Sequence, residues 1–594
     1  MPLVLHSVGA PLGEPVAEDF DFIRHVWLLG KRSLLDGGGS QAFWRPVAHQ
    51  LYYLALGPLI VAHPRVVATI HIALLILCAV LLYRTLRAVW SGPMAAAAAS
   101  FPFLAESTRT LISWPSHFVD LGSLLFAVLA LHEAMKRRMA TSLVALLAAL
   151  LCKELAVVAA VLIPLLPRAE RESWRERGRW AIATGALTAA WGTTYVAIRH
   201  AAHLALPHNL ETDAATLAVG PAERMFWAVG NSVRAIFSLP AVRELGELWV
   251  YVAIVLLLAL AVILPRMRRG TAHAATQAAT PAAPSGVALA APWVAWGLAW
   301  FALSSAALST IFPIWAPNRS LFGGVGFGIA LVALLGAARP AIVAALLALR
   351  LAALALSPGP PSQVTRTAPA TGAFMDFERL ARLQRIMSET RATLRARFAP
   401  LPHGANVGYD NLPQESEYAF GASNALQVWY GDTTLRWVRH ETLAADTTMP
   451  LATIVQWQAR HDPEVVLVDP PAMRAMLRSI DQFEASAWSA GEASLREAAA
   501  AISEPRASLF FGTIHSLRAT EYQRRGFVDS ALAEAGRALA LAPEMRQPRY
   551  LIAGLAVMRN DRSTMQAQLD TIRILEPNDP NLPVFLRAIS KYRP

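Results

Sequence analysis

The stretch Thr141–Leu166 reads TSLVALLAALLCKELAVVAAVLIPLL, an apolar run with two adjacent charges, Lys153 and Glu154, in its middle. Charges are costly inside a membrane, so they mark a functional site by default. Basic residues flank the stretch at Arg138 and Arg168, which predicts that both of its ends are cytoplasmic. One crossing needs about 20 residues. The sequence therefore predicts two short helices that turn at the charged pair, with the turn in an outward-facing cavity.

The composition of the whole chain is that of a membrane protein. Of its 594 residues, 55% are hydrophobic and 16% are charged, and the mean hydropathy is +0.38. The net charge of +11 comes from lysines and arginines that gather in short loops at helix ends, which is the cytoplasmic pattern, so we expect no nucleic-acid partner. The other apolar segments are Val66–Tyr83, Pro93–Leu104, His117–Met135, Val250–Leu264 and Leu321–Leu335.

The basic clusters also predict which side of the membrane each loop faces. If the clusters are cytoplasmic, the loops Glu106–Pro115 and Phe312–Arg319 face outward, as does the chain after about Ser357. Counting Arg224–Leu239 as a span would reverse this pattern, so we interpret it as an interfacial helix on the outer surface, with a buried span as the alternative.

The beginning of the chain does not fit this topology by itself. Met1–Leu12 is apolar but too short to cross a membrane, and it lacks the features of a signal peptide. The polar stretch Glu14–Pro46 should face outward, which requires a crossing before it. Either the sequence starts within the first helix and truncates it, or this copy has lost that helix, and we favour truncation.

The outward-facing loops bring together residues suited to one chemistry. A carboxylate can take a proton from an acceptor hydroxyl, and lysine and arginine can hold a phosphate leaving group. In the alternative interpretation the acids solvate a loop, the histidine caps or packs a helix, and Lys153 pairs with Glu154. The candidate catalytic residues are Asp19 and Asp21, and the candidate substrate-binding residues are Arg45, Glu106, His117, Asp120, Lys153, Glu154 and Arg319.

The order of these motifs resembles a known family over roughly the first 357 residues. The matching elements are the acidic pair Asp19 and Asp21, Trp44-Arg45-Pro46, the stretch Phe101–Leu121, Lys153-Glu154, and Arg319–Phe322. They resemble the GT-C-type membrane glycosyltransferases, and most closely the protein O-mannosyltransferases with transmembrane helices followed by tetratricopeptide repeats. The chain departs from the family around Leu104, where His-Pro is replaced, and at Arg319-Ser-Leu-Phe, which lacks two tyrosines.

The resemblance implies a fold and an activity. The implied fold is a polytopic α-helical membrane protein, a GT-C-like bundle of about 10–11 spans, in the inner (plasma) membrane of a bacterium. The implied activity moves a sugar from a polyprenyl-phosphate donor to a protein or glycan acceptor on the extracytoplasmic face. The family's first-loop acid carries over to Asp19 or Asp21, and we place Asp19 ahead. No cofactor beyond the lipid-linked sugar is expected, and a divalent metal is left open.

The rest of the chain has the amino-acid composition of soluble domains and linkers. A linker rich in Ala, Thr and Pro covers Pro265–Pro292. We expect domains at 1–357 (membrane), 358–480 (extracytoplasmic α/β) and 481–594 (tetratricopeptide-like). The α/β domain is predicted from a helix at Phe374–Phe398 and from strands at 405–409 and 464–470.

The C-terminal domain is predicted from a spacing. Ala519 and Ala553, and likewise Pro543 and Pro577, lie 34 residues apart, which is the tetratricopeptide period. A preceding helix, Ala485–Ile502, should pack against the repeats. The domain would bind proteins or merely cover the α/β domain. The competing hypothesis for the whole chain is a non-catalytic membrane scaffold that presents this repeat domain to partners.

Overall fold

The computed structural model describes residues 7–168, 173–205, 219–241, 286–336, 340–356, 359–360, 363–368, 373–439, 449–577 and 579–590. The chain forms two compact units, one of Met1–Pro361 with Pro369–Gln384 and one of Ser362–Ala368 with Arg385–Pro594. The predicted span Val250–Leu264 and residues 265–285 of the predicted linker lie outside the described residues. The end of that linker is helical, because helix α14 begins at Gly286.

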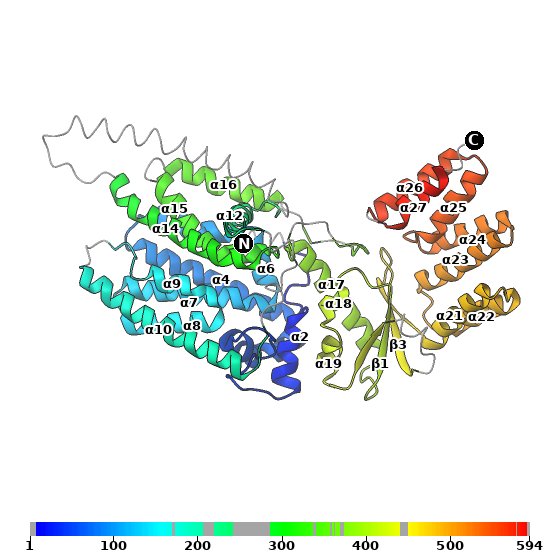
Figure 1. Cartoon of the computed structure of the whole chain (residues 1–594), viewed down its shortest axis with the longest axis horizontal. Coiled ribbons are helices and arrows are strands. Elements are labelled where there is room, and N and C mark those ends of the chain that lie inside the picture. Colours follow the sequence, from blue (N-terminus) through cyan, green and yellow to red (C-terminus); the bar gives the residue numbers. More distant parts are fainter. Residues whose placement is uncertain are drawn as a thin grey trace. The chain divides into compact units, whose positions relative to one another are not determined.

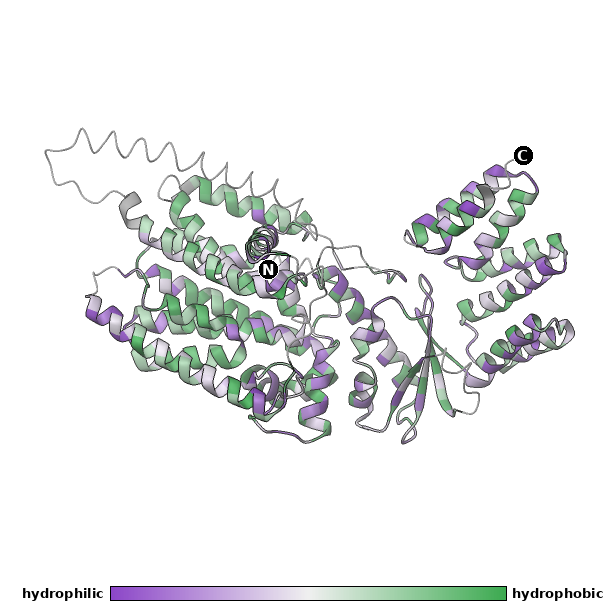
Figure 2. Cartoon of the chain, in the orientation of Figure 1, coloured by the Kyte–Doolittle hydropathy of each residue, from purple (hydrophilic) through white to green (hydrophobic). Residues whose placement is uncertain are grey.

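The first unit is built from apolar helices, shown in green in Figure 2. In the described residues, five helices are long and apolar enough to cross a membrane, and three are apolar but shorter. The long ones are α4 (Pro64–Arg87), α10 (Trp174–Ala201) and three helices that are continuous with a short turn: α7 (Phe118–Met135) with η4 (Pro115–His117) before it, α14 (Gly286–Leu308) with η7 (Ser309–Ile311) after it, and α15 (Leu321–Gly336) with η8 (Pro317–Ser320) before it. The shorter ones are α3 (Tyr52–Ala62) with its preceding turn, α8 (Met139–Cys152) and α16 (Pro340–Leu356). This architecture is compatible with an integral membrane protein, and it confirms the helices predicted at 66–83, 117–135 and 321–335.

Large apolar side chains on α4 and α10 are exposed. Ile76 is 58% exposed on α4, and Ile182 and Val196 are 74% and 66% exposed on α10. Helices that present such faces need an apolar neighbour such as lipid tails. The arginine-rich segment after Arg168 has the composition of a loop, but its later residues form the first turns of α10. Ser173 caps this helix, because its side chain accepts a hydrogen bond from the Glu176 N–H at 3.2 Å.

The charged stretch does form two short helices. Helix α8 ends before Lys153, whose backbone is extended (φ −160°, ψ 142°), and the chain continues through η5 (Glu154–Ala156) and α9 (Val157–Leu162). The Arg168 guanidinium donates to the Ala134 carbonyl at 2.9 Å, next to the start of α8. The chain thus returns to the end from which it left, which confirms the predicted turn.

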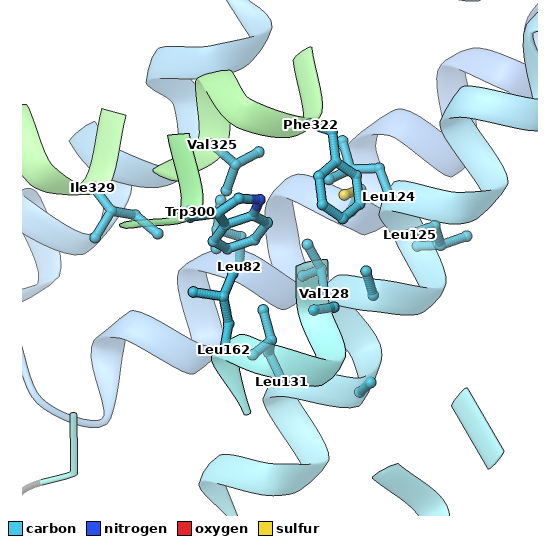
Figure 3. Close-up of a cluster of buried hydrophobic side chains, with 14 of the residues drawn as sticks. Leu82, Leu124, Leu125, Val128, Leu131, Leu162, Trp300, Phe322, Val325 and Ile329 are labelled. Atoms are coloured by element: carbon cyan, nitrogen blue, oxygen red, sulfur yellow. The ribbon is translucent and has the colours of Figure 1, made fainter. Parts of the chain in front are cut away.

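Buried side chains from many helices of this unit form its core, part of which is shown in Figure 3. Its members include Leu82 of α4, Val128 of α7, Leu162 of α9, Trp300 of α14 and Val325 of α15. Helices α14 and α15 approach closely through glycines, since a Cβ on Gly326 would lie 2.6 Å from the Gly297 carbonyl oxygen. Small residues allow such backbone contact, which drives helix association in membranes.

The shorter elements of the first unit lie between and around these helices. They are α2 (Glu18–Ile23), η1 (Arg24–Leu28), η2 (Val47–Leu51), α5 (Gly92–Ser100), η3 (Phe101–Phe103), α6 (Ser107–Ser113), η4 (Pro115–His117), α12 (Pro221–Ile236), η7 (Ser309–Ile311) and η8 (Pro317–Ser320). The segment predicted at Pro93–Leu104 is therefore a short helix, α5, followed by a turn. Helix α12 is the predicted helix at 224–239, and its 16 residues are fewer than the roughly 20 that a crossing needs.

The second unit contains a four-stranded sheet. Its strands are β1 (Asn406–Asp410), β2 (Arg436–Arg439), β3 (Leu451–Trp457) and β4 (Val465–Val468), in the order β2-β1-β3-β4. Strand β1 is parallel to β2 and β3, and β4 is antiparallel to β3. The strands predicted near 405 and 464 are β1 and β4, whereas β2 and β3 were not predicted. Helices α18 (Ser416–Phe420) and α19 (Asn424–Tyr430) belong to this unit, and α17 (Phe377–Arg397) continues into it from the first.

Helical hairpins follow the sheet (Figure 1). They are α21 (Pro470–Glu484), α22 (Trp488–Ala501), α23 (Ser508–Arg524), α24 (Val528–Leu541), α25 (Gln547–Met558), α26 (Arg562–Leu575) and α27 (Asn581–Ser590). The predicted helix at 485–502 is α22. The small residues Ala519, Ala531, Ala538 and Ala553 are all fully buried, so they let neighbouring helices approach. Their repeat family stays a prediction.

A buried acid should make the second unit sensitive to pH. Burial raises the pKa of Glu464 to about 7, with the nearby Glu389 adding to the shift and Arg385 opposing it. A carboxyl whose folded pKa exceeds its unfolded value stabilises the fold below the unfolded pKa and loses this contribution as pH rises through the folded one. We expect thermal unfolding, followed by tryptophan fluorescence, to shift to lower temperature between about pH 5 and pH 8. Glu464→Gln should flatten this dependence, and an unchanged slope in that variant would contradict the assignment.

Candidate functional site

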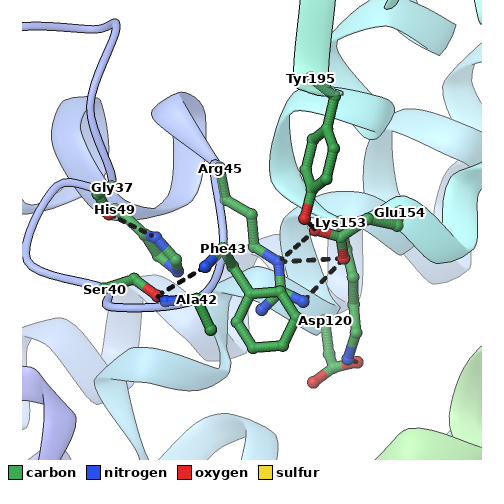
Figure 4. A network of polar contacts seen from close by, with 10 residues as sticks. All are labelled: Gly37, Ser40, Ala42, Phe43, Arg45, His49, Asp120, Lys153, Glu154 and Tyr195. Atoms are coloured by element: carbon green, nitrogen blue, oxygen red, sulfur yellow. Dashed lines mark hydrogen bonds and ion pairs between the residues drawn. The ribbon is translucent and has the colours of Figure 1, made fainter. Parts of the chain in front are cut away.

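Arg45 and Glu154 form the centre of a polar network within the first unit (Figure 4). The Arg45 Nε lies 3.1 Å from both carboxylate oxygens of Glu154, and its Nη2 donates to Oε2 at 2.7 Å. The Tyr195 hydroxyl of α10 donates to the same carboxylate at 2.9 Å. Arg45 also stacks over the Phe43 ring at 4.0 Å. A forked pair of this kind fixes the orientation of both side chains.

A second pair stands beside the first. The Lys153 ammonium donates to Asp120 Oδ1 at 2.5 Å, and the Asn318 amide donates to Asp120 Oδ2 at 3.1 Å. The two charged side chains are only 15% and 12% exposed. Lys153 therefore pairs with Asp120, and Glu154 pairs with Arg45. The alternative in which Lys153 and Glu154 pair with each other is wrong. The extended backbone at Lys153 points the two neighbouring side chains apart, as it does in a strand.

Glu18 is the solvent-exposed carboxylate of this region. It is the first residue of α2 and is exposed, yet burial by the surrounding protein raises the pKa of its carboxyl, and a hydrogen bond with Ser116 opposes this shift. The positive charges of Arg45, Arg319 and Lys153, which come from three separate parts of the sequence, also lower this pKa. Glu18 directly precedes the acidic pair Asp19 and Asp21 but was not among the predicted site residues.

Asp19 occupies a different environment. It is fully buried, and its carboxylate accepts hydrogen bonds from the Tyr53 hydroxyl at 2.5 Å, the Val16 N–H at 2.8 Å and the Trp114 indole at 2.9 Å. Burial is the largest influence and raises the pKa of Asp19 to about 8, although these three donors oppose the shift. A carboxyl in this position holds α2 against α3 and the junction between α6 and η4, and its role as a base stays a prediction.

The remaining site residues divide into two groups. His117 and Arg319 lie near the network, since Asp120, Lys153 and Arg319 all interact electrostatically with the His117 ring. The His117 ring packs on Trp114 at 4.6 Å, and its Nδ1 lies 3.2 Å from the Thr110 carbonyl oxygen. The interpretation of His117 as a packing residue therefore has a structural basis.

Glu106 has different charged neighbours, and the backbone of Asp21 lies against a loop. Arg109 and Asp376 are the charged groups that act most strongly on Glu106, and its backbone N–H donates to Ser238 at 2.9 Å. Burial raises the pKa of Glu106 to about 7. The backbone of Asp21 lies against the loop that contains Gly39, where an added Cβ would come within 2.7 Å of its carbonyl oxygen.

Two functional candidates were missed in the sequence because their partners are distant in the chain. Tyr195 lies 41 positions after Glu154, and Asn318 lies 198 positions after Asp120. A tyrosine within an apolar helix and an asparagine within a Pro-rich loop do not by themselves indicate a functional residue. Asn318 does directly precede Arg319, and that adjacency was the one available signal.

The described residues contain no group of three or more His, Cys, Asp or Glu side chains that could hold a metal ion. No protein-family model matches this chain, no curated protein matches it, and no solved structure matches its fold.

Proposed function

We propose that the protein is a membrane glycosyltransferase that moves a sugar from a polyprenyl-phosphate donor to a protein or glycan acceptor. The observation that carries the proposal is the exposed Glu18 carboxylate beside Arg45, Lys153 and Arg319 in a unit of apolar helices. A base next to fixed cations suits a reaction that takes a proton from a hydroxyl and releases a phosphate.

The chemistry assigns a task to each side of the site. The acceptor oxygen attacks the anomeric carbon of the sugar, and the bond from that carbon to the phosphate oxygen breaks. Glu18 takes the hydroxyl proton. The leaving phosphate keeps the bonding electrons, and its added negative charge is stabilised by Arg319 and Lys153. Asp120 holds Lys153 in place through the 2.5 Å contact.

A second candidate function is a non-catalytic membrane scaffold that presents the helical hairpins to partner proteins. The observation in its favour is that Arg45 and Glu154, like Lys153 and Asp120, neutralise each other within the protein. Paired charges of this kind can serve fold specificity alone. The two functions predict different results for the loss of Arg319.

The test compares exported proteins from cells with and without the gene by glycopeptide mass spectrometry. We expect a set of glycopeptides to disappear on deletion and to return with the wild-type gene. Arg319→Ala should return them weakly, with transfer reduced by about 10²-fold or more, the loss typical for one electrostatic group. Arg319→Lys should recover part of that activity, because it keeps the charge without the fork.

Glu176→Gln is the matched control. Glu176 lies on α10 with its side chain 46% exposed and outside the network, so this variant should behave as wild type. A glycopeptide pattern unchanged by deletion of the gene would remove the enzyme proposal. Full complementation by Arg319→Ala would favour the scaffold.

A further inference from the structure

The second unit contains a cavity of about 420 Å³ where the sheet meets the helical hairpins. On one side lie the carboxyl ends of the parallel strands β1 and β3, at Asp410 and Trp457. On the other side lie α21, the start of α25, the end of α26 and the start of α27. Ligands commonly bind at the carboxyl ends of parallel strands. The volume falls within the range of roughly 300–1,000 Å³ that ligand pockets occupy.

One wall of the cavity is apolar and adaptable. It includes Met473, Met476 and Met545, with Leu477 and Ile480 beside them. Three of the chain's 14 methionines therefore line this one cavity. Methionine is flexible and polarisable, and it is used repeatedly on surfaces that accept varied apolar side chains. This wall suits an apolar side chain of a ligand.

The polar lining carries both signs of charge in equal number. The arginines are Arg366, Arg460 and Arg546, and the carboxylates are Asp410, Glu544 and Glu576. Arg546 is already paired with Glu576 at 2.6 Å. A balanced lining does not suit a polyphosphate or a nucleic acid, which require an excess of cations. It suits a chain of amide groups that both donates and accepts hydrogen bonds.

Arg460 is the cation at this site that remains open to a ligand. It is exposed, and no ion-pair or hydrogen-bond partner for its side chain lies among the described residues. Its backbone φ is +65°, a left-handed conformation that costs energy in a residue other than glycine. Such strain gathers at binding sites. Its guanidinium is placed to meet a carbonyl or a carboxylate.

We propose that this cavity binds a short extended peptide segment of a partner protein, with an apolar side chain against the methionine wall and a backbone carbonyl or carboxylate at Arg460. The site belongs to the second unit alone and does not depend on sugar transfer in the first. It gives the hairpin region a binding role beyond covering the sheet.

The test uses the full-length protein in detergent and two labelled nonapeptide pools. Both pools have random flanks, and the central residue is fixed as leucine in one and as serine in the other. We expect the leucine pool to be retained about tenfold more than the serine pool, because a buried leucine side chain contributes that much or more. Met545→Gln and Arg460→Ala should each lower retention of the leucine pool by about fivefold or more.

Met558→Gln is the matched control, since Met558 ends α25 at 75% exposure and lies outside the cavity. A second readout is the spectrum of ¹³C-methyl methionine, in which Met473, Met476 and Met545 should shift on adding the leucine pool while Met558 does not. Equal retention of the two pools, or shifts confined to other methionines, would overturn the proposal. Displacement of the leucine pool by tripolyphosphate would assign the cavity to an anionic ligand instead.

Discussion

Glu18→Gln should lower glycosyl transfer by about 10²–10⁴-fold, the usual cost of losing a positioned acid or base. The substitution keeps the size of the side chain and removes its ability to accept the acceptor's proton. Because Glu18 is exposed at the start of α2, the folded structure should tolerate the change. The measurement is glycopeptide recovery in the deletion strain, normalised to the amount of protein in the membrane.

Asp19→Asn and Asp21→Asn are the comparison variants. The sequence motif assigns the base to Asp19 or Asp21, whereas the geometry favours the accessible Glu18. Asp19→Asn should keep most transfer and lower thermal stability, because Tyr53, Trp114 and Val16 all donate to its carboxylate. If Asp19→Asn abolished transfer with normal stability while Glu18→Gln remained active, the assignment would return to Asp19. Activity in all three variants would favour the scaffold.

Asp120→Ala should strongly destabilise the first unit. It leaves the Lys153 ammonium without its carboxylate in a place where that side chain is only 15% exposed, and removing one partner of a buried pair costs about 3–5 kcal/mol. The double variant Asp120→Ala with Lys153→Met should recover most of this loss, because no unpaired charge remains. Thermal unfolding of purified protein measures both effects.

The double variant also separates fold from function. It should be stable yet defective in transfer, because the cation that faces the leaving phosphate is gone. Glu176→Ala is the control in the same unit, where both Glu176 and its partner Arg137 are 46% exposed and the ion-pair distance is 4.0 Å. Such a surface pair contributes about 1 kcal/mol or less. An Asp120→Ala effect no larger than this control would contradict the structural role assigned to the pair.

The apolar segments of the chain could be predicted from residue type alone. Helices near 66–83, 117–135 and 321–335 follow from runs of hydrophobic residues that have no other stable state in a membrane. The break at Lys153 was also readable, because both flanks of its segment are basic and the length is too short for two crossings. Helix α10 was not predicted, and its first turns carry arginines that resemble a loop.

The partners of the charged residues depended on tertiary structure. Lys153 and Glu154 are neighbours in sequence, but an extended backbone sends them to Asp120 and Arg45. Strands β2 and β3 were not predicted, because whether a segment forms a strand depends on its neighbours in the sheet more than on its own residues.

Residue composition along the chain is enough to predict a helical apolar part, a charged turn within it and a separate polar part. Those properties follow from the free energy of transferring each residue, which adds up locally along the chain. Which acid is accessible depends instead on how α2 packs in the folded protein. Glu18 and Asp19 differ by one position on α2, and a helix rotates about 100° per residue, so one carboxylate faces solvent and the other is buried.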